Sequence, residues 1–522
     1  MKTISSGKVI GARRVMGGYS AIVKVQETDV WAENEYGGTI AEGEAGVDDA
    51  SVIKSAATEI GEGKIFIARG TYKLIQKISC PAGIFIESEG AELDISGLND
   101  VAFEFGNDTQ LVYDKLTGLK GFKVTGSSTN TNTLLVRASQ IVKGFVLEKI
   151  IHKNLNNLVE VRGACYDATI RDCWGKNLKG TWIKLVTVDL DGKPYKPNGT
   201  EIINCELSNS WADVGGTGIE IYSSNEDTSV SGAVGTVKIH NVWLEALNVG
   251  IYSEARSTII SNCPLISAVD KGIHINTKYV DSTPINESGR GAQIIGNLIS
   301  VPQSSSYGIY LDGLPYEHII SANFFRDVHG VAIYCTNKQY IAVIGNIFSI
   351  MSDSAVGVSG VTNYSRIIGN SFIGSVPSPR GTGIDASGDF IIISSNTFAG
   401  LNYPINATSL NWVYDASNIF YGNANNPVFG TKYKNSGTKT LSGDGTTTDF
   451  EIGAHGLAVT DPNKIVVKVT PISADAIAAS PCIGYVDPAD NTKIRVKFAS
   501  APASGTDNVK IAWKAEVTSS PD

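Results

Sequence analysis

The chain of 522 residues has little charge and no long apolar run. Charged residues make up 18%, below the roughly 25% of an average globular chain. With 43 Lys and Arg against 52 Asp and Glu, the formal net charge is −9, which excludes a basic nucleic-acid-binding protein. No segment approaches the roughly 18 consecutive apolar residues of a transmembrane helix. Residues 1–8 also lack the apolar stretch of a secretory signal peptide, so we expect no export by that route.

Cysteines are few and poorly arranged for disulfides or for a zinc site. Their number, seven, is odd, and no two form a C-x-x-C pair. We therefore expect buried thiols that pack in a core, including a stacked column of Cys173, Cys205 and Cys263. Residues 189–192 contain two Asp but fit a hairpin turn better than a calcium loop. The sequence thus indicates neither a metal nor a cofactor.

Short repeats are the most informative feature of the sequence. In one phrase, apolar residues and a small residue precede Asn, and Phe often follows two positions after it. The clearest copies contain Asn297, Asn323, Asn346, Asn370 and Asn396. Weaker copies contain Asp172, Asn204, Asn241, Asn262 and Asn418. A second phrase, Gly-Ile at the start of an alternating strand, occurs at Gly218, Gly250, Gly272, Gly308 and Gly383.

This repeat predicts an all-β fold, a parallel β-helix. Each unit holds two or more strands of three to five residues, separated by Gly, Asn and Ser without helical periodicity. Turns of roughly 20–25 residues would stack at about 4.8 Å, the spacing of neighbouring strands. Asn297, Asn323, Asn346 and Asn370 would then form a hydrogen-bonded ladder through their amides. Phe348, Phe372 and Phe398 would stack as a spine inside the helix.

The two ends of the chain differ from the repeat. Residues 48–58 predict a short amphipathic helix that Asp48 or Asp49 caps and that covers the open end of a β-helix over residues 46–430. Residues 1–45 lack strong periodicity and are interpreted as an N-terminal arm or cap. In residues 431–522, strands at 464–470, 493–498 and 508–515 alternate with Pro, Gly and Asp turns, which predicts a small antiparallel β-sandwich.

Residues 46–72 resemble a known family. A helix containing Asp48 and Asp49 is followed by Gly63, by three apolar residues, and then by Ala68-Arg69-Gly70-Thr71-Tyr72. This pattern resembles the beginning of the β-helix in pectate-lyase-like tailspike proteins of bacteriophages, with Ala68 in place of the usual proline. The resemblance implies a right-handed β-helix, a homotrimer and a polysaccharide that is bound or cleaved. It does not imply one reaction, because the fold hosts lyases, hydrolases and pure binders.

The resemblance also gives expectations for location and for the ends of the chain. It implies a virion or extracellular location, with residues 1–45 as an arm that attaches to a virion baseplate or as a partly ordered end. The C-terminal module would trimerise or contact carbohydrate. Neither nucleic-acid binding nor membrane insertion is expected.

Glycoside hydrolysis needs two carboxyl groups across the scissile bond, and stacked turns can supply them. The residues after each Gly-Ile should point outward, as should those two positions later. The first column contains Glu220, Tyr252, His274, Tyr310 and Asp385, and the second contains Tyr222, Glu254, Asn276, Asp312 and Thr336. We expect catalysis by Glu220, Glu254 and Asp312, with one carboxyl group as general acid and another as base or nucleophile. Aromatic rings stack on sugar faces, so the expected substrate-binding residues are Tyr222, Tyr252, His274 and Tyr310.

Two other places compete for the site. Trp211 lies beside Asp213 in a loop framed by glycines, and Trp243 is followed two positions later by Glu245. Trp243 is interpreted as a core residue at the position that Phe occupies in later repeats. In a trimer, the cleft would also be able to lie between chains.

The predicted function is a tailspike-like depolymerase that binds and hydrolyses a host surface polysaccharide. A solvated outer face with ordinary Glu and Tyr explains the same pattern about equally well for any one residue. Two alternatives remain open: an adhesin or tail fibre without enzymatic activity, and a polysaccharide lyase. A lyase would use a base together with a cation beside a uronate, for which Lys271, Arg256 and His274 are candidates.

Overall fold

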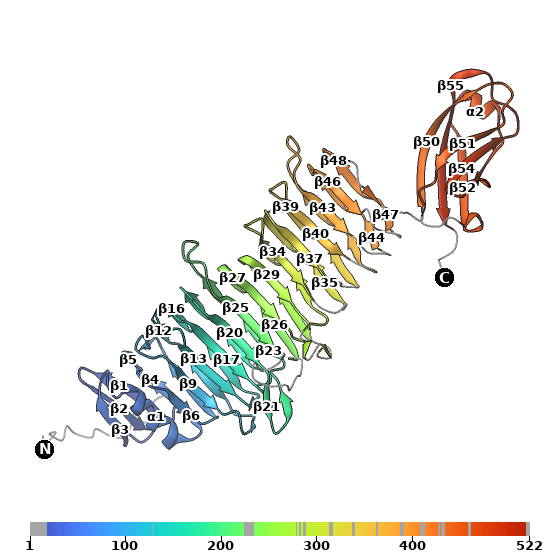
Figure 1. Cartoon of the computed structure of the whole chain (residues 1–522). Coiled ribbons are helices and arrows are strands. Elements are labelled where there is room, and N and C mark those ends of the chain that lie inside the picture. The colour runs from blue at the N-terminus through green and yellow to red at the C-terminus, as the bar shows by residue number, and fades with distance from the viewer. Residues whose placement is uncertain are drawn as a thin grey trace, which may run out of the picture.

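The computed structural model shows a long β-helix followed by a small β-unit beyond its C-terminal end (Figure 1). Among the described residues, no helix is both long and apolar enough to span a membrane. The structure describes residues 18–127, 129–223, 234–277, 279–280, 283–284, 289–312, 317–336, 340–361, 364–386, 391–407, 413–425, 428–429, 434–457 and 461–517.

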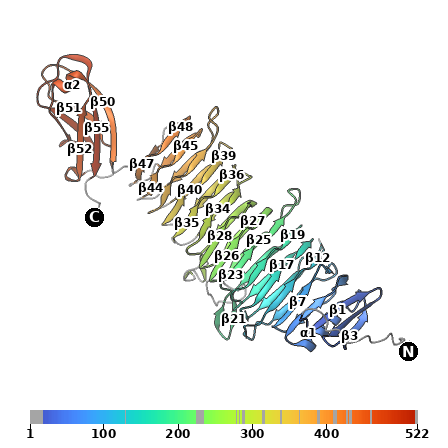
Figure 2. The same cartoon turned by 180° about the vertical axis from the view of Figure 1, so that it is seen from behind.

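Each full turn of the β-helix contributes one strand to a first parallel sheet and two strands to a second, and Figure 2 shows the same stacking from behind. In spatial order the first sheet, here the β4–β47 sheet, contains β3 (Thr39–Glu44), β2 (Asp29–Asn34), β1 (Ala21–Gln26), β4 (Gly63–Ile67), β7 (Ile84–Ser88), β11 (Thr117–Lys120), β15 (Phe145–Glu148), β18 (Thr169–Arg171), β23 (Thr200–Ile203), β26 (Thr236–His240), β28 (Ser257–Ser261), β32 (Gln293–Ile295), β35 (His318–Ser321), β38 (Ile341–Ile344), β41 (Arg366–Ile368), β44 (Ile391–Ser394) and β47 (Val413–Ala416).

The second sheet consists of two columns of strands, and β27 and β29 run through both. The β5–β48 column contains β5 (Thr71–Lys73), β8 (Glu92–Asp94), β12 (Lys123–Thr125), β16 (Ile151–Lys153), β19 (Trp174–Lys176), β24 (Glu206–Ser208), β27 (Trp243–Ser253), β29 (Leu265–Ile275), β33 (Leu298–Ser300), β36 (Phe324–Val328), β39 (Ile347–Ile350), β42 (Ser371–Ile373), β45 (Thr397–Ala399) and β48 (Ile419–Tyr421).

The β6–β49 column adjoins it in each turn. It contains β6 (Ile78–Cys80), β9 (Val101–Gly106), β13 (Leu134–Ser139), β17 (Asn157–Arg162), β20 (Thr181–Val186), β25 (Thr217–Tyr222), the second halves of β27 and β29, β34 (Tyr307–Leu311), β37 (Val331–Cys335), β40 (Val356–Val361), β43 (Thr382–Ala386), β46 (Tyr403–Ala407) and β49 (Val428–Phe429). Three short pairs complete the β-helix: β10 (Val112–Tyr113) with β14 (Ile141–Val142), β21 (Val188–Leu190) with β22 (Lys193–Tyr195), and β30 (Tyr279–Val280) with β31 (Thr283–Pro284).

The Asn ladder is confirmed, and it is buried. The Asn346 side chain donates from Nδ2 to the carboxamide oxygen of Asn370 at 3.0 Å and to the Ile320 carbonyl at 2.9 Å. Its own oxygen accepts from the backbone and side-chain nitrogens of Asn323, both at 2.9 Å. The same bonds recur from Asn297 to Asn418 at steps of 26, 23, 24, 26 and 22 residues. Each carboxamide thereby satisfies buried backbone groups of the turn below it.

The predicted Phe spine is also present and is longer than expected. Phe348, Phe372 and Phe398 stack with ring centroids 4.5 and 5.0 Å apart and nearly parallel planes. The stack continues to Phe325 at 4.7 Å and to Phe420 at 5.2 Å.

The weaker upstream copies are out of phase by one residue, which corrects the prediction. Asp172, Asn204, Asn241 and Asn262 are themselves the turn residues with positive φ, the place that Gly345 and Gly369 take downstream. The inward position after each turn is therefore filled by Cys173, Cys205, Val242 and Cys263. Cys173 and Cys205 are neighbours there, but Val242 separates them from Cys263, so the expected column of three thiols is interrupted. Burial raises the pKa of the Cys263 thiol to about 12, which favours packing over reactivity.

A helix and an antiparallel extension close the N-terminal end. Helix α1 (Asp49–Ile60) buries its predicted apolar face, which consists of Val52, Ile53, Ala56 and Ala57. Asp48 occupies the N-cap position, as predicted, but its side chain makes no capping hydrogen bond. The Asp48 carboxylate accepts from the Glu44 amide, and that of Asp49 accepts from the amides of Gly46 and Lys73 at 3.0 and 2.6 Å. Strand β1 pairs in parallel with β4, and β2 and β3 follow it as antiparallel neighbours.

The C-terminal unit has its own core between two three-stranded antiparallel sheets. One sheet orders β50 (Lys434–Gly443), β55 (Gly505–Val517) and β52 (Ile465–Pro471); the other orders β51 (Asp449–Ala454), β54 (Lys493–Phe498) and β53 (Cys482–Val486). A short helix, α2 (Ala474–Ala478), and a 3-10 turn at Pro462–Lys464 lie between strands.

His152 is buried in the core below β19, where it contacts Trp182 and constrains the residue at position 175. The indole nitrogen of Trp182 donates to Nε2 of His152 at 2.7 Å, and burial lowers the pKa of His152 to about 3. Gly175 lies on the next turn, where an added Cβ would come within 2.2 Å of the imidazole. The ring therefore requires glycine above it and remains neutral at physiological pH.

We expect Asn346→Ala to lower the free energy of unfolding by about 3 kcal/mol, because it leaves the Asn323 amide and the Ile320 carbonyl buried without partners. Denaturant unfolding of the full chain measures the change. Asn425→Ala is the matched control, since the exposed Asn425 side chain donates a single hydrogen bond to the Asn402 carbonyl at 2.9 Å and its loss should cost less than about 1 kcal/mol. Equal losses in both variants would contradict a structural role for the buried ladder.

We expect His152 to make stability fall as the pH drops from about 6.5 towards 3. The unfolded chain binds a proton at a pKa near 6.5, whereas the folded pKa is about 3, so acid favours the unfolded state in this window and has no such effect above it. The wild type should lose up to about 1.4 kcal/mol per pH unit more than His152→Gln. Unfolding free energies measured from pH 7 to 4 test this, and parallel curves for the two proteins would disprove it.

Candidate functional site

The predicted outward column on the β6–β49 strands exists and follows strand register. Glu220 pairs with Tyr252, Tyr252 with His274, and His274 with Tyr310 on successive turns. The column continues through Tyr334 and Ser359 to Asp385, so the sequence analysis missed two of its members. These side chains are half-buried on the outer face of the sheet.

The aromatic rings of this column pack on one another and on Tyr222 of the second column. We call Tyr222, Tyr252, His274, Tyr310 and Tyr334 the tyrosine face. Centroids of neighbouring rings lie 5.0 to 5.4 Å apart, and His274 meets its two tyrosine neighbours edge to face. Lys184 and Lys271 place their ammonium groups 5.2 Å from the rings of Tyr222 and Tyr310, respectively. The result is an aromatic strip with cations beside it.

Glu254 is the most constrained of the expected carboxylates. Its side chain is 0% exposed and accepts from the Tyr252 hydroxyl at 2.5 Å and from the Ser223 amide at 2.9 Å. Asn276 in turn donates to the Tyr252 hydroxyl at 2.8 Å. Burial and the neighbouring Glu254 charge raise the pKa of Tyr252, so this phenol keeps its proton. Glu254 thus holds the hydroxyl end of Tyr252 in place.

Asp312 lies in the same second column and is half-buried. Its carboxylate accepts from the Thr336 hydroxyl at 2.6 Å, and its amide donates to the Ile275 carbonyl on the turn below. The Glu254 amide donates to Ile221 and the Asn276 amide to Ser253, so the order of the column is Tyr222, Glu254, Asn276, Asp312 and Thr336.

Register sets the distances between the three carboxylates. Glu254 and Asp312 are two turns apart, a backbone separation of about 10 Å. Glu220 and Asp312 are three turns apart, or about 14 Å. Glu220 and Glu254 are one turn and two residues apart, a backbone separation of about 8 Å. Inverting glycosidases place their carboxyl groups roughly 6.5–9.5 Å apart, so the pair of Glu220 and Glu254 and the pair of Glu254 and Asp312 both come near that geometry.

The competing residues form a separate cluster on the β5–β48 column. Glu245 accepts from the indole nitrogens of Trp211 and Trp243 at 3.2 and 3.1 Å, and from the Ser208 hydroxyl at 3.2 Å. Trp211 remains 48% exposed. Asp213 does not join them, because its carboxylate forms an ion pair with Lys179 at 2.5 Å.

The interpretation of Trp243 as a core residue is wrong. Trp243 pairs with Glu206 and points outward, whereas Leu244 takes the inward place that Phe348 holds further along. The reason is the one-residue phase error at Asn241, since a shift by one moves a side chain to the opposite face of a strand. The sequence analysis also missed Trp174 and Glu206, which lie in the same outward row as Trp243.

No group of three or more His, Cys, Asp and Glu within the described segments is arranged to hold a metal ion. The side chains gathered at the two clusters are carboxylates, aromatic rings and lysines.

Comparison with known proteins supports the fold. No family model and no curated protein matches the chain. Among solved structures, a double mutant of the tailspike protein of E. coli bacteriophage HK620 is similar, with a TM-score of 0.58 and 14% identity over 93% of this chain and 92% of that one. A single mutant of that tailspike in complex with a pentasaccharide gives a TM-score of 0.54 and 13% identity over the same shares. The chain therefore has the parallel β-helix fold of these tailspike proteins, as the resemblance of residues 46–72 implied.

Proposed function

We propose that the protein is a phage tailspike that binds a polysaccharide on the host surface and hydrolyses it at the tyrosine face. The observation that carries the proposal is the column in which Glu254 and Asp312 stand two turns apart beside stacked aromatic rings. The tailspike of similar fold that was solved with a bound pentasaccharide supports a saccharide ligand.

The proposed reaction is inverting hydrolysis. Asp312, the more accessible carboxylate, removes a proton from water, whose oxygen attacks the anomeric carbon. Glu254 is the proposed general acid, which donates a proton to the departing glycosidic oxygen. Glu220 binds sugar hydroxyls, and Tyr222, Tyr252, Tyr310 and His274 line the path of the chain. One glycosidic bond breaks and one new reducing end forms.

A binding protein without activity is the second candidate. Both carboxylate oxygens of Glu254 already accept hydrogen bonds. Glu254 is therefore also suited to a structural role, in which it positions the Tyr252 ring and takes no part in a reaction. A lyase is less favoured, and it would be recognised by an unsaturated uronate product.

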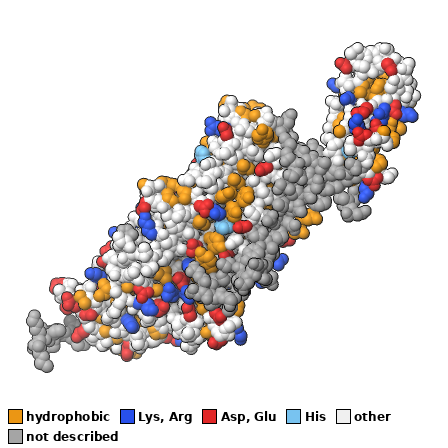
Figure 3. Space-filling view, in the orientation of Figure 1, with side chains coloured by type: hydrophobic (Ala, Val, Ile, Leu, Met, Phe, Trp, Pro, Cys, Tyr) orange, Lys and Arg blue, Asp and Glu red, His pale blue; other side chains and the backbone are white. Residues whose placement is uncertain are grey.

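Self-association is part of the proposal. Hydrophobic side chains form patches on the β-helix surface in Figure 3. Exposed large ones are frequent between residues 319 and 421, where Ile319, Phe324, Ile344, Ile347, Tyr403 and Ile419 are examples. Such surfaces mark interfaces in soluble proteins, so we propose a homotrimer that buries this region. The N-terminal arm would attach the trimer to a virion baseplate; residues 1–17 of that arm lie outside the described residues.

We expect Asp312→Asn and Glu254→Gln each to lower turnover of the host polysaccharide by about 10²- to 10⁴-fold, the usual contribution of a general acid or base. New reducing ends and polymer size measure turnover, while pull-down of intact polymer measures binding, which should persist. Asp385→Asn, in the first column but several turns away, is the matched control and should remain active. Full activity in both Asp312→Asn and Glu254→Gln would show that the site lies elsewhere, with Glu245→Gln the next variant to test.

We expect the full chain to sediment as a trimer at micromolar concentration, and Ile347→Lys to shift it towards monomer. A charge at this half-exposed position would have to be desolvated in the interface. Analytical ultracentrifugation measures both proteins, and Ile75→Lys, at a similarly exposed position near the N-terminal end of the β-helix, is the control that should remain a trimer. A wild type that stays monomeric would contradict the proposed assembly.

A further inference from the structure

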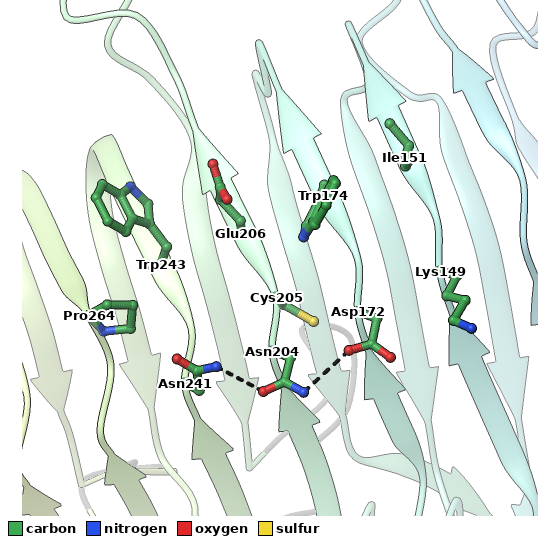
Figure 4. A pocket seen from close by; sticks show the side chains of 10 residues that line it. All are labelled: Lys149, Ile151, Asp172, Trp174, Asn204, Cys205, Glu206, Asn241, Trp243 and Pro264. Carbon is green, nitrogen blue, oxygen red and sulfur yellow. Dashed lines mark hydrogen bonds between the residues drawn. The ribbon is translucent and has the colours of Figure 1, made fainter.

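A groove runs along the outer face of the β5–β48 column, away from the tyrosine face. Two rows of side chains line it on three successive turns: Asp172, Asn204 and Asn241 in one, and Trp174, Glu206 and Trp243 in the other (Figure 4). We call these six residues the tryptophan trough. The hollow measures about 590 Å³ and adjoins a second of about 510 Å³ that shares Ile151, Trp174 and Glu206 with it. The combined shape follows the helix axis and suits an extended chain more than a compact ligand.

The two tryptophans form regularly spaced platforms. Trp174 and Trp243 pair with Glu206 from either side, so they lie two strand spacings apart, about 10 Å. Trp174 is 56% exposed, although burying an indole is normally favourable. Glu245 accepts from the Trp243 indole nitrogen and so acts as a positioning residue for that ring. Aromatic rings at this interval, with a carboxylate between them, match alternate sugars of a polysaccharide.

The second row supplies hydrogen-bonding groups. Asn241 donates to the Asn204 oxygen at 2.9 Å, and Asn204 donates to Asp172 at 3.3 Å. Asn204, Asn241 and Glu206 are exposed, and each side-chain amide has a second N–H to offer. Sugar hydroxyls are suited to such a row, because they donate to carboxylates and accept from amides.

The neighbouring hollow has three lysines and two glutamates, Glu92 and Glu206, in its lining, so positive charge is in slight excess there. Lys153 and Lys176 lie directly above one another on paired strands, and both line it together with Lys123. Within the described residues, none of these three lysines forms a salt bridge, in a chain whose net charge is −9. Like charges opposite each other on adjacent strands repel, and an anionic group on a ligand would relieve that repulsion.

Further along the same strand column the corresponding face is apolar. The outward residues paired there are Phe324 and Ile347, in the region proposed for self-association. The change from apolar to charged and amide-bearing residues argues that a hydrated, charged ligand covers the trough and not a second copy of the chain.

We propose that the tryptophan trough is a second saccharide-binding site, separate from the tyrosine face, and that it holds an acidic polysaccharide. Trp174 and Trp243 stack on sugar rings, Asp172 and Glu206 accept hydroxyl protons, and Lys153 and Lys176 neutralise the acidic substituents. The site retains polymer on the trimer independently of cleavage, which raises avidity.

An array of acidic and neutral bacterial surface polysaccharides, probed with the full-length chain, tests this. We expect binding to acidic members, at least tenfold weaker binding in Trp174→Ala and Trp243→Ala, and a shallower dependence on salt in Lys153→Gln and Lys176→Gln. Tyr36→Ala and Lys468→Gln replace an exposed ring and an exposed ammonium outside the trough, and should behave as wild type.

Three results would overturn the proposal: binding to neutral glycans alone, no binding to any glycan of the array, or unchanged binding in all four variants of Trp174, Trp243, Lys153 and Lys176. A trimer-to-monomer shift in Trp174→Ala would instead identify the trough as an interface between chains and would equally refute the site. The two proposals fail separately. Binding to the trough without any cleavage by the wild type refutes only the proposed hydrolysis, whereas cleavage with unchanged binding in the trough variants refutes only this inference.

Discussion

The buried row of asparagine carboxamides is the constraint on which the register of the C-terminal half depends. Each carboxamide accepts from a backbone amide and donates to a backbone carbonyl of the turn below, and it donates to the carboxamide of the turn above. Because an unpaired buried amide is costly, a turn that slipped by one residue would lose several such bonds at once. Equivalent side chains are therefore held one above another over many turns.

This stacking converts sequence positions far apart into continuous rows with distinct chemistry. On the β6–β49 strands the rows carry tyrosines and carboxylates, and on the β5–β48 strands they carry tryptophans, amides and lysines. Both sets lie on rigid strands, which suits recognition of an extended ligand without rearrangement of the backbone. Strand register therefore determines which groups of neighbouring turns meet along these rows.

The sequence was sufficient to predict the fold and most residues of the tyrosine face, but it did not predict the rows of the tryptophan trough. Asn297 to Asn418 and the Gly-Ile strands repeat with a clear phase, so the rows through Tyr252, His274 and Tyr310 could be aligned by inspection. Upstream, Asn241 and its counterparts stand one place before the inward position, and that single offset reversed the faces assigned to Trp243 and Leu244. The burial of Glu254 depends on Tyr252 and Ser223, contacts that no spacing in the sequence reveals.

The pairing of β1 with β4 covers the strand edge at the N-terminal end of the β-helix. A bare β4 would present a row of unpaired backbone groups to which another coil could add, as in fibril growth. Strand β1 occupies that edge, and the reversal into β2 and β3 replaces parallel pairing by antiparallel pairing. The N-terminal hairpins thus block end-to-end polymerisation, and we expect a chain shortened to begin at α1 to self-associate through the exposed edge of β4.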